Sequence, residues 1–422
     1  MLGKKNNKCK ILTLILMMLS LNTIYQLPYL MYYYYTPLQE AMGLVGRDAD
    51  YGRLLNVYGI ANVVLYLPGG WIADKFDSKK LMVISMIGTG ILGLWEATFP
   101  SYTMLMVIFV LFALTTVLTY WSASIKVINV VADADEQGSM FGTLEAGRGI
   151  VGLVITTIIA SVFAALAANS GLAMTVVVAF ISVVMIIVGV LMAFFLPKAK
   201  PDQNATNATI VDGIKAMGYA FKLPATYLLA GMIFCGSMTL ASASYYAPYL
   251  EQACGMSSTI TSIFATYRGT ICGLIGASIA TVLAVKMKRS SAPMIGAGII
   301  LIACFALLFI MPASAAIMWP VMIIAIIASM GNSVFRALYY ATIDESGTPK
   351  NMVGSLIGIA SLIGFLPDTF YTSLCGGWLD THGMGGFKYI FISAMCAAAL
   401  GLVCAFLSDR QIKAYRAQNA GN

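Results

Sequence analysis

The feature that most constrains this chain is a succession of apolar runs, each close to the length that spans a bilayer. A helix needs about 20 apolar residues to cross the hydrocarbon core. Only 10% of the 422 residues are charged, whereas a soluble domain averages about 25%. We therefore predict an all-α membrane protein with twelve transmembrane helices. The predicted spans are 11–36, 53–73, 81–99, 103–131, 140–168, 172–196, 224–250, 259–285, 293–312, 316–342, 352–378 and 387–408.

The distribution of basic residues predicts how these spans are oriented. Cytoplasmic loops of membrane proteins carry an excess of lysine and arginine. With both termini in the cytoplasm, 18 of the 25 basic residues fall in inner segments and three in outer segments. We expect a multi-pass protein of the cell inner membrane whose two ends are cytoplasmic. The first span has no small-residue cleavage site, so we interpret it as a retained helix.

Several classes of function are disfavoured by composition. The net charge of +7 follows from the predicted orientation and does not indicate a nucleic-acid partner. The eight cysteines form no CxxC pair, and His382 is the sole histidine, so we expect neither a metal site nor a cofactor. We find no motif for a nucleophile or an acid/base set, and therefore predict that the chain is not an enzyme. We expect it to act as a monomer in the lipid bilayer.

The chain divides into two similar halves. A long polar segment separates the predicted spans six and seven, which gives an N-terminal six-helix bundle (1–197), a cytoplasmic linker (198–223) and a C-terminal six-helix bundle (224–422). YYTPLQEAMG, residues 34–43, recurs 211 residues later as YYAPYLEQACG. Two six-helix pseudo-repeats of this kind build the major facilitator fold, in which the substrate site lies near mid-membrane between the halves.

A loop motif adds an independent resemblance to the major facilitator superfamily. GGWIADKFDSKKL, residues 69–81, is similar to the signature between spans two and three of that family, with Gly70, Asp74 and Lys75 on signature positions. The resemblance implies a gating role in which Asp74 caps the cytoplasmic N-terminus of span eleven. A second GGWLD, residues 376–380, lies on the predicted outer side, and we interpret it as a coincidence.

Four cations lie within predicted spans: Lys126, Arg148, Arg268 and Arg336. Glu145 is three residues from Arg148, so the two can neutralise each other. Arg268 lies about ten residues into its span, near mid-membrane at ~1.5 Å per residue. Charges in a bilayer are expensive and tend to be functional. The excess of positive charge predicts that these four residues bind an anionic substrate.

Each cation also has an alternative interpretation. Lys126 can extend its ammonium group to the membrane surface, and Arg336 is within reach of Asp344 or Glu345 at the end of its helix. Asn332 shares a helix face with Arg336, and Tyr29 and Tyr32 recur at helical spacing in the first span. With Tyr246 at the end of the seventh span, these residues are further candidates for substrate binding. Asp368 and Glu145 are candidate proton-coupling residues.

We therefore expect a secondary active transporter that moves a small organic anion, a carboxylate or a sugar phosphate, across the inner membrane by alternating access. The alternative is a proton-coupled symporter of a neutral sugar or nucleoside. Family resemblance also suggests a pair of basic residues, one from each half, as in organic-phosphate antiporters. The first span carries no arginine, however, and the fifth lacks the Gly-Pro of drug antiporters.

Overall fold

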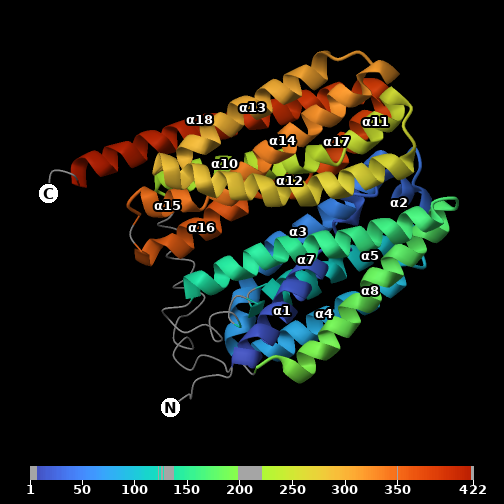
Figure 1. The fold of residues 1–422 in the computed structure, drawn as a ribbon, viewed down its shortest axis with the longest axis horizontal. Coiled ribbons are helices and arrows are strands. Elements are labelled where there is room, and N and C mark those ends of the chain that lie inside the picture. The colour runs from blue at the N-terminus through green and yellow to red at the C-terminus, as the bar shows by residue number, and fades with distance from the viewer. Residues whose placement is uncertain are drawn as a thin grey trace. The chain divides into compact units, whose positions relative to one another are not determined.

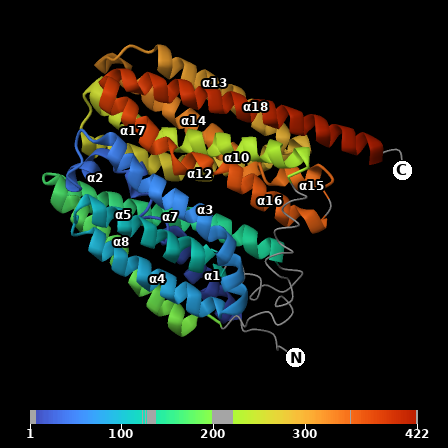
Figure 2. The same ribbon diagram turned by 180° about the vertical axis from the view of Figure 1, so that it is seen from behind.

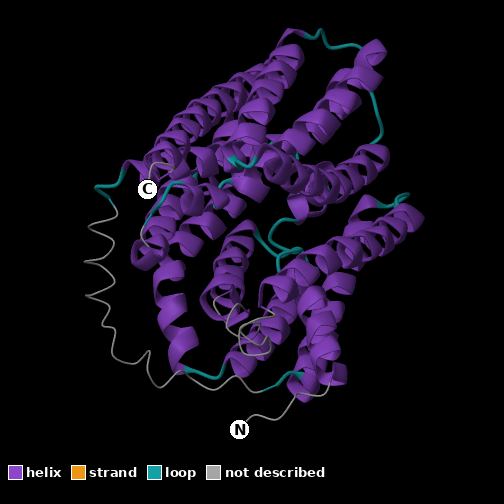
Figure 3. Ribbon diagram, turned by 60° about the vertical axis from the view of Figure 1, so that its left-hand side comes forward, coloured by secondary structure: helices purple, strands orange, loops and turns teal. Residues whose placement is uncertain are grey.

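The computed structural model describes residues 7–121, 123–124, 127, 137–197, 221–348 and 350–419, and within them all regular secondary structure is helical (Figure 3). The chain divides into two compact units, Met1–Val45 with Val57–Asn207 and Gly46–Asn56 with Ala208–Asn422, called unit 1 and unit 2 here. Helix α3 begins in unit 2 and continues in unit 1. The predicted boundaries at 197 and 223 do not anticipate this shared helix, and they remain a prediction.

Unit 1 is coloured blue to green in Figure 1, and in it α4 packs along α8 while α1 packs against α7 and α8. Its elements are α1 (Asn7–Thr23), η1 (Leu30–Tyr32), α2 (Tyr35–Ala41), α3 (Asp48–Lys75), α4 (Ser78–Glu96), α5 (Tyr102–Ala113), the π-helical η2 (Leu114–Trp121), α7 (Gln137–Leu166) and α8 (Ser170–Phe195).

In unit 2 the long helix α18 lies between α13 and α10, and the views in Figures 1 and 2 agree on this arrangement. The elements of this unit are α10 (Pro224–Ala243), α11 (Tyr246–Cys254), α12 (Ser258–Met287), α13 (Ser291–Ile310), η4 (Ala315–Ile317), α14 (Met318–Leu338), α15 (Ala341–Glu345), α16 (Lys350–Gly364), η5 (Leu366–Thr369), α17 (Tyr371–His382), η6 (Gly383–Gly385) and α18 (Gly386–Asn419).

Eight helices in the described part of the chain are long and apolar enough to cross a membrane, and Ile11–Thr23 is a shorter apolar helix. The prediction of an all-α membrane protein is confirmed. The count of twelve spans stays a prediction. Two predicted spans, 53–73 and 81–99, coincide with α3 and α4, which are long helices but do not meet the same standard of length and hydropathy.

The sequence repeat forms a structural repeat. Helix α2 begins at Tyr35 and α11 at Tyr246, the second tyrosine of YYTP and of YYAP, and each follows a break in the helical chain. Pro37 and Pro248 occupy the first turn of their helices, where a missing N–H is tolerated, but they prevent the preceding helix from continuing through them. Three predicted spans are thus discontinuous, because α16 and α17 are also separated, by η5 with Pro367.

A polar cluster ties α18 to the loop between α12 and α13. The buried Asp409 accepts hydrogen bonds from Arg289 Nη1 (2.9 Å) and Ser291 Oγ (2.8 Å), and Lys413 Nζ lies 2.7 Å away. Burial acts to raise the pKa of Asp409, but the hydrogen bonds from Lys413 and Ser291 and the charge of Arg289 outweigh it and lower that pKa. The ionised Asp409 therefore stabilises unit 2 at pH values above about 3.9, the ordinary pKa of an aspartate.

We expect Asp409→Asn to lower the free energy of unfolding by about 1–3 kcal/mol, because Arg289 and Lys413 lose a charged acceptor. Since the carboxyl has a lowered pKa in the fold, its contribution is lost as pH falls through that folded pKa, below about 4. Thermal melting of the purified protein at pH 7 and at pH 3 checks this. An Asp409→Asn variant that melts with the wild type at pH 7 contradicts it.

Candidate functional site

Arg268 is the most deeply held cation of unit 2. It lies on α12 with 7% of its surface exposed. Its Nη1 donates a hydrogen bond to Ser329 Oγ on α14, and its Nη2 donates to the carbonyl oxygen of Ala243 at 3.0 Å. The guanidinium carbon lies 5.1 Å from the centre of the Tyr246 ring. These two acceptors are neutral groups that orient the guanidinium.

The break between α10 and α11 explains this geometry. Ala243 is the last residue of α10, and carbonyl groups at a helix C-terminus lack intrahelical partners. Tyr246 begins α11 directly after the break and presents its buried ring to Arg268. Arginine on the face of an aromatic ring is stabilised electrostatically. The predicted grouping of Arg268 with Tyr246 is thus present within unit 2.

Polar residues continue from this point along α14. Asn332, which is 5% exposed, accepts a hydrogen bond from Thr239 Oγ1 at 3.0 Å. Arg336 follows one turn later and is exposed. Its side chain passes close to Gly236 of α10, because a Cβ added to this glycine would lie 3.6 Å from Arg336 Cγ. Ser329, Asn332 and Arg336 recur at three and four residues and share one face of the helix.

Glu345, one of the two acids within sequence reach of Arg336, has other partners. It accepts hydrogen bonds from the backbone N–H of Ser290 (2.9 Å) and from Ser290 Oγ (2.6 Å), so it caps the start of α13. The side chain of Asp344 lies outside the described residues, so pairing of Arg336 with Asp344 stays a prediction. Arg336 acts electrostatically on the half-buried Asp368, which lies in η5 at the break of span eleven. Unit 2 therefore contains Arg268 and a pair of electrostatically interacting residues, Arg336 and Asp368.

The candidate residues of unit 1 gather around aromatic rings. Tyr29 contacts Tyr32 and Tyr58, with ring centres 5.5 and 5.6 Å apart. Arg148 on α7 is half-buried and acts electrostatically on the phenol groups of Tyr25 and Tyr120. The backbone carbonyl of Arg148 accepts a hydrogen bond from an asparagine of α1 at 2.9 Å. The phenol groups of Tyr25 and Tyr120 thus lie within electrostatic range of Arg148 in unit 1, just as the Tyr246 ring lies beside Arg268 in unit 2.

Several predicted site residues lie outside the described part of the chain. Lys126 is one of them. Gly70 and Asp74 belong to α3 and Glu145 belongs to α7, but their side chains are not described. Lys75 ends α3 and is exposed. The predicted gate at Asp74 and the predicted proton-coupling role of Glu145 therefore stay predictions.

The segment GGWLD has a structural role that sequence reasoning missed. Asp380 on α17 accepts hydrogen bonds from the backbone N–H groups of Asp48 (2.8 Å) and Ala49 (2.9 Å), and it therefore caps the start of α3. A Cβ on Gly376 would lie 2.1 Å from the carbonyl oxygen of Asp48, and one on Gly52 would lie 2.3 Å from that of Thr372. We call this contact of α3 with α17 the capped crossing. GGWLD therefore has a structural role of its own, and its interpretation as a coincidental likeness to the loop signature stays a prediction.

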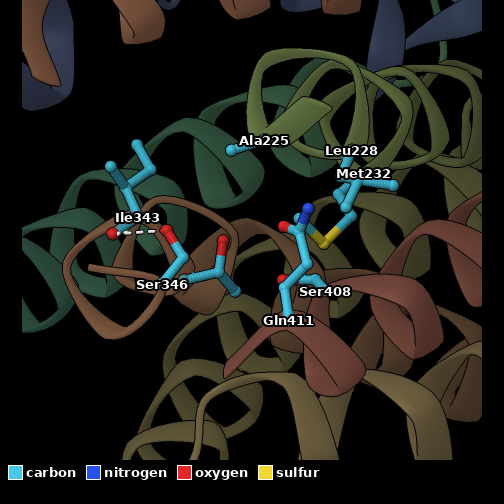
Figure 4. A pocket seen from close by; sticks show the side chains of 8 residues that line it. Ala225, Leu228, Met232, Ile343, Ser346, Ser408 and Gln411 are labelled. Atoms are coloured by element: carbon cyan, nitrogen blue, oxygen red, sulfur yellow. Dashed lines mark hydrogen bonds between the residues drawn. The ribbon is translucent and has the colours of Figure 1, made fainter. Parts of the chain in front are cut away.

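A small crevice in unit 2 is a poor candidate for the substrate site. Leu228 and Met232 of α10 line it together with Gln411 of α18, and none of its lining side chains is charged (Figure 4). Ser346 Oγ at its edge donates to the carbonyl oxygen of Ile343 at 2.8 Å. Among the described residues, Arg148, Arg268 and Arg336 do not line it.

Comparisons with known proteins agree with this architecture. Residues 11–371 match the family profile described as Major Facilitator Superfamily. The chain is 31% identical over 415 residues to the inner membrane protein YqcE of Escherichia coli (strain K12), covering 95% of each chain. It is 27% identical to the inner membrane protein YihN of the same organism, covering 92% of this chain and 93% of that protein.

Two solved structures share the fold at low identity. A bacterial homologue of the human lysosomal transporter Spinster, in an inward-facing and occupied conformation, superposes with a TM-score of 0.68 at 15% identity, covering 97% of this chain and 98% of that one. A point mutant of the nucleoside transporter NupG superposes with a TM-score of 0.71 at 14% identity, covering 96% of this chain and 99% of that one.

Proposed function

Because this chain belongs to the major facilitator superfamily, and is thus a membrane transporter rather than an enzyme, we propose that its substrate is a small organic anion. The proposed substrate is a carboxylate or a sugar phosphate, carried across the inner membrane by alternating access. Both termini are placed in the cytoplasm in this proposal, because basic residues concentrate in the segments on that side.

The observation that carries the proposal is the setting of Arg268. A buried cation in a membrane protein is costly, and the contacts that orient Arg268 include a hydroxyl, a carbonyl and an aromatic face. These contacts fix the orientation of the planar guanidinium group of Arg268, which presents its N–H donors as a fork. A carboxylate or phosphate can accept two parallel hydrogen bonds from that fork, which gives both affinity and geometric selectivity.

A second candidate function is proton-coupled symport of a neutral sugar or nucleoside. The observation that favours it is the electrostatic coupling between Arg336 and Asp368. When Asp368 is ionised, it neutralises the charge of Arg336, and when it is protonated, it does not. Proton binding and release at Asp368 then provide the change of charge during transport, and the substrate itself need not be charged.

A thermal-shift screen of the purified protein separates the two functions. Carboxylates, sugar phosphates, sugars and nucleosides are compared at equal concentration and ionic strength. A ligand at about 100 times its Kd stabilises the folded state by about 2.7 kcal/mol. We expect the largest shift from an anion. A shift produced only by a neutral sugar or nucleoside contradicts the proposal and supports the second function.

Asp368→Asn gives a further distinction. If the substrate is an anion, removing this carboxylate leaves Arg336 more positive, and we expect the leading anion of the screen to bind more tightly, roughly threefold to tenfold, which corresponds to about 1 kcal/mol. If Asp368 instead carries the coupling proton, substrate-driven proton movement stops while counterflow exchange continues. Binding measurements and counterflow in proteoliposomes, with the exposed Glu40→Gln as the matched control, provide the two readouts.

A further inference from the structure

A buried polar stripe runs along one face of α4. Ser85, Thr89, Gly93 and Glu96 are spaced at four, four and three residues, so they share this face, and all four are buried. The side chains of Ser85, Thr89 and Glu96 are 0% exposed. The stripe faces other helices of unit 1 and ends in a carboxyl group.

The hydroxyl groups of the stripe are fully engaged. Ser85 Oγ and Thr119 Oγ1 lie 2.6 Å apart, and Thr89 Oγ1 donates to Thr115 Oγ1 at 2.8 Å. At Gly93 the polar group comes from α8, because an added Cβ would lie 2.2 Å from Ser182 Oγ. These hydroxyls satisfy the general rule that buried polar atoms find partners.

Glu96 departs from that rule. Among the described residues, neither of its carboxyl oxygens has a hydrogen-bond partner. The elements that pack on α4 are α8, η2 and α5. Helix α8 contains no ionisable residue, and the other two contribute only Tyr120 and Tyr102, which are neutral at pH 7.

Arg148, the half-buried cation on α7, does not compensate Glu96 either. Arg148 acts on Tyr25 and Tyr120, whereas burial is the only influence found on Glu96 among the described residues. The stretch around Leu27, whose side chain meets Gly93, contributes Tyr25 and Tyr29 and no charged residue. An ionised carboxylate in this setting would cost several kcal/mol, so the neutral, protonated acid is the stable form.

From this setting we infer that Glu96 is a proton-binding site of unit 1, loaded with a proton in this conformation and emptied when the transport cycle admits water to the end of α4. A carboxyl without partners weakens the fold even when it is neutral. An ionisable residue retained within a membrane span at such a cost points to function. The inference rests on the proposed transport function, and it adds a proton as the coupled ion at a residue distinct from Asp368 and Glu145.

The protonation state is tested first, on the purified protein in lipid without any substrate. In an infrared difference spectrum at pH 7, wild type minus Glu96→Gln, we expect a C=O band of a protonated carboxyl. Glu40 on α2 is exposed, so the matched control, wild type minus Glu40→Gln, should show a carboxylate band instead. A carboxylate band from Glu96 would overturn the inference.

Coupling is tested in proteoliposomes loaded with a pH-sensitive dye. Glucose 6-phosphate, pyruvate and uridine are offered in turn, and proton entry and counterflow exchange are both recorded for the probe that the wild type carries. We expect Glu96→Gln, an isostere of the protonated acid, to reduce substrate-driven proton entry at least tenfold while exchange stays within about twofold. Proton entry equal to that of the wild type would overturn the inference.

The two proposals fail in different ways. If uridine is carried and its proton entry is lost in Glu96→Gln, the anion proposal is wrong but the proton site stands. If an anion is carried and Glu96→Gln leaves proton entry unchanged, the proton site is wrong but the anion proposal stands. Glu40→Gln should leave both readouts unchanged.

Discussion

Arg268→Ala is expected to abolish binding and transport of the anionic substrate while leaving the protein folded. Truncating one partner of a buried, hydrogen-bonded charge pair costs about 2–5 kcal/mol of binding, which is roughly 30-fold to several-thousandfold in affinity. The measurement is thermal shift with the leading anion, followed by counterflow in proteoliposomes. Uptake that survives in Arg268→Ala for every substrate of the wild type contradicts the proposed function.

The fold itself should tolerate this change. Arg268 donates hydrogen bonds to Ser329 and to the Ala243 carbonyl. Its removal loses these bonds and leaves a void, but it also removes the cost of keeping a charge out of water. We expect the unliganded variant to melt close to the temperature of the wild type. A lost ligand response at an unchanged melting temperature separates a binding role from a structural one.

Two companion variants sharpen the comparison. Arg268→Lys keeps the charge but loses the planar fork, so we expect partial binding with weaker selectivity among anions. Arg410 on α18 is exposed and lies over the ring of Phe406, and Arg410→Ala serves as the matched control with unchanged binding. Equal losses in the two alanine variants would point to a general effect of net charge.

Gly376→Val is expected to open the capped crossing between α3 and α17. The added Cβ would lie 2.1 Å from the backbone oxygen of Asp48, and backbone atoms cannot move aside as a side chain can. Overpacking costs about 1–3 kcal/mol where side chains can adjust, so we expect a loss above that range. The melting temperature of the purified protein should fall clearly.

Hydrogen exchange locates the damage. The amides of Asp48 and Ala49 donate to Asp380, so their exchange should accelerate in Gly376→Val. The adjacent Gly377 has no atom within 4 Å of an added Cβ, and Gly377→Ala should leave both the melting temperature and the exchange unchanged. Wild-type protection at Asp48 in Gly376→Val would show that the crossing does not depend on this glycine.

The apolar runs predicted the helical class and most helix positions because a bilayer imposes a local rule. Every backbone polar group must be satisfied within the segment that crosses the lipid, so each span needs its own run of apolar residues. The loop GGWIADKFDSKKL and the repeat of YYTP and YYAP are also local, and they were sufficient to indicate the family. The same local reasoning placed Arg268 near mid-membrane.

Side-chain partners followed a different rule. Arg268 meets Ser329, which is 61 residues away in the chain, and Glu345 caps Ser290 rather than meeting Arg336. Neither pairing follows from helical spacing, because it depends on which helices pack together and at what height. The structural role of GGWLD was not predicted for the same reason, since its aspartate caps a helix that begins 332 residues earlier.

Composition and short-range spacing were therefore enough to predict the membrane class, the family and the excess of positive charge within the predicted spans. Three further features depend on packing: Arg268 meets Ser329, the Ala243 carbonyl and the Tyr246 ring, α3 is shared between the two units, and Glu96 is buried with no hydrogen-bond partner among the described residues. Burial and pairing depend on the residues that surround a group in space. Local spacing places a residue on a helix face, but packing selects its neighbours.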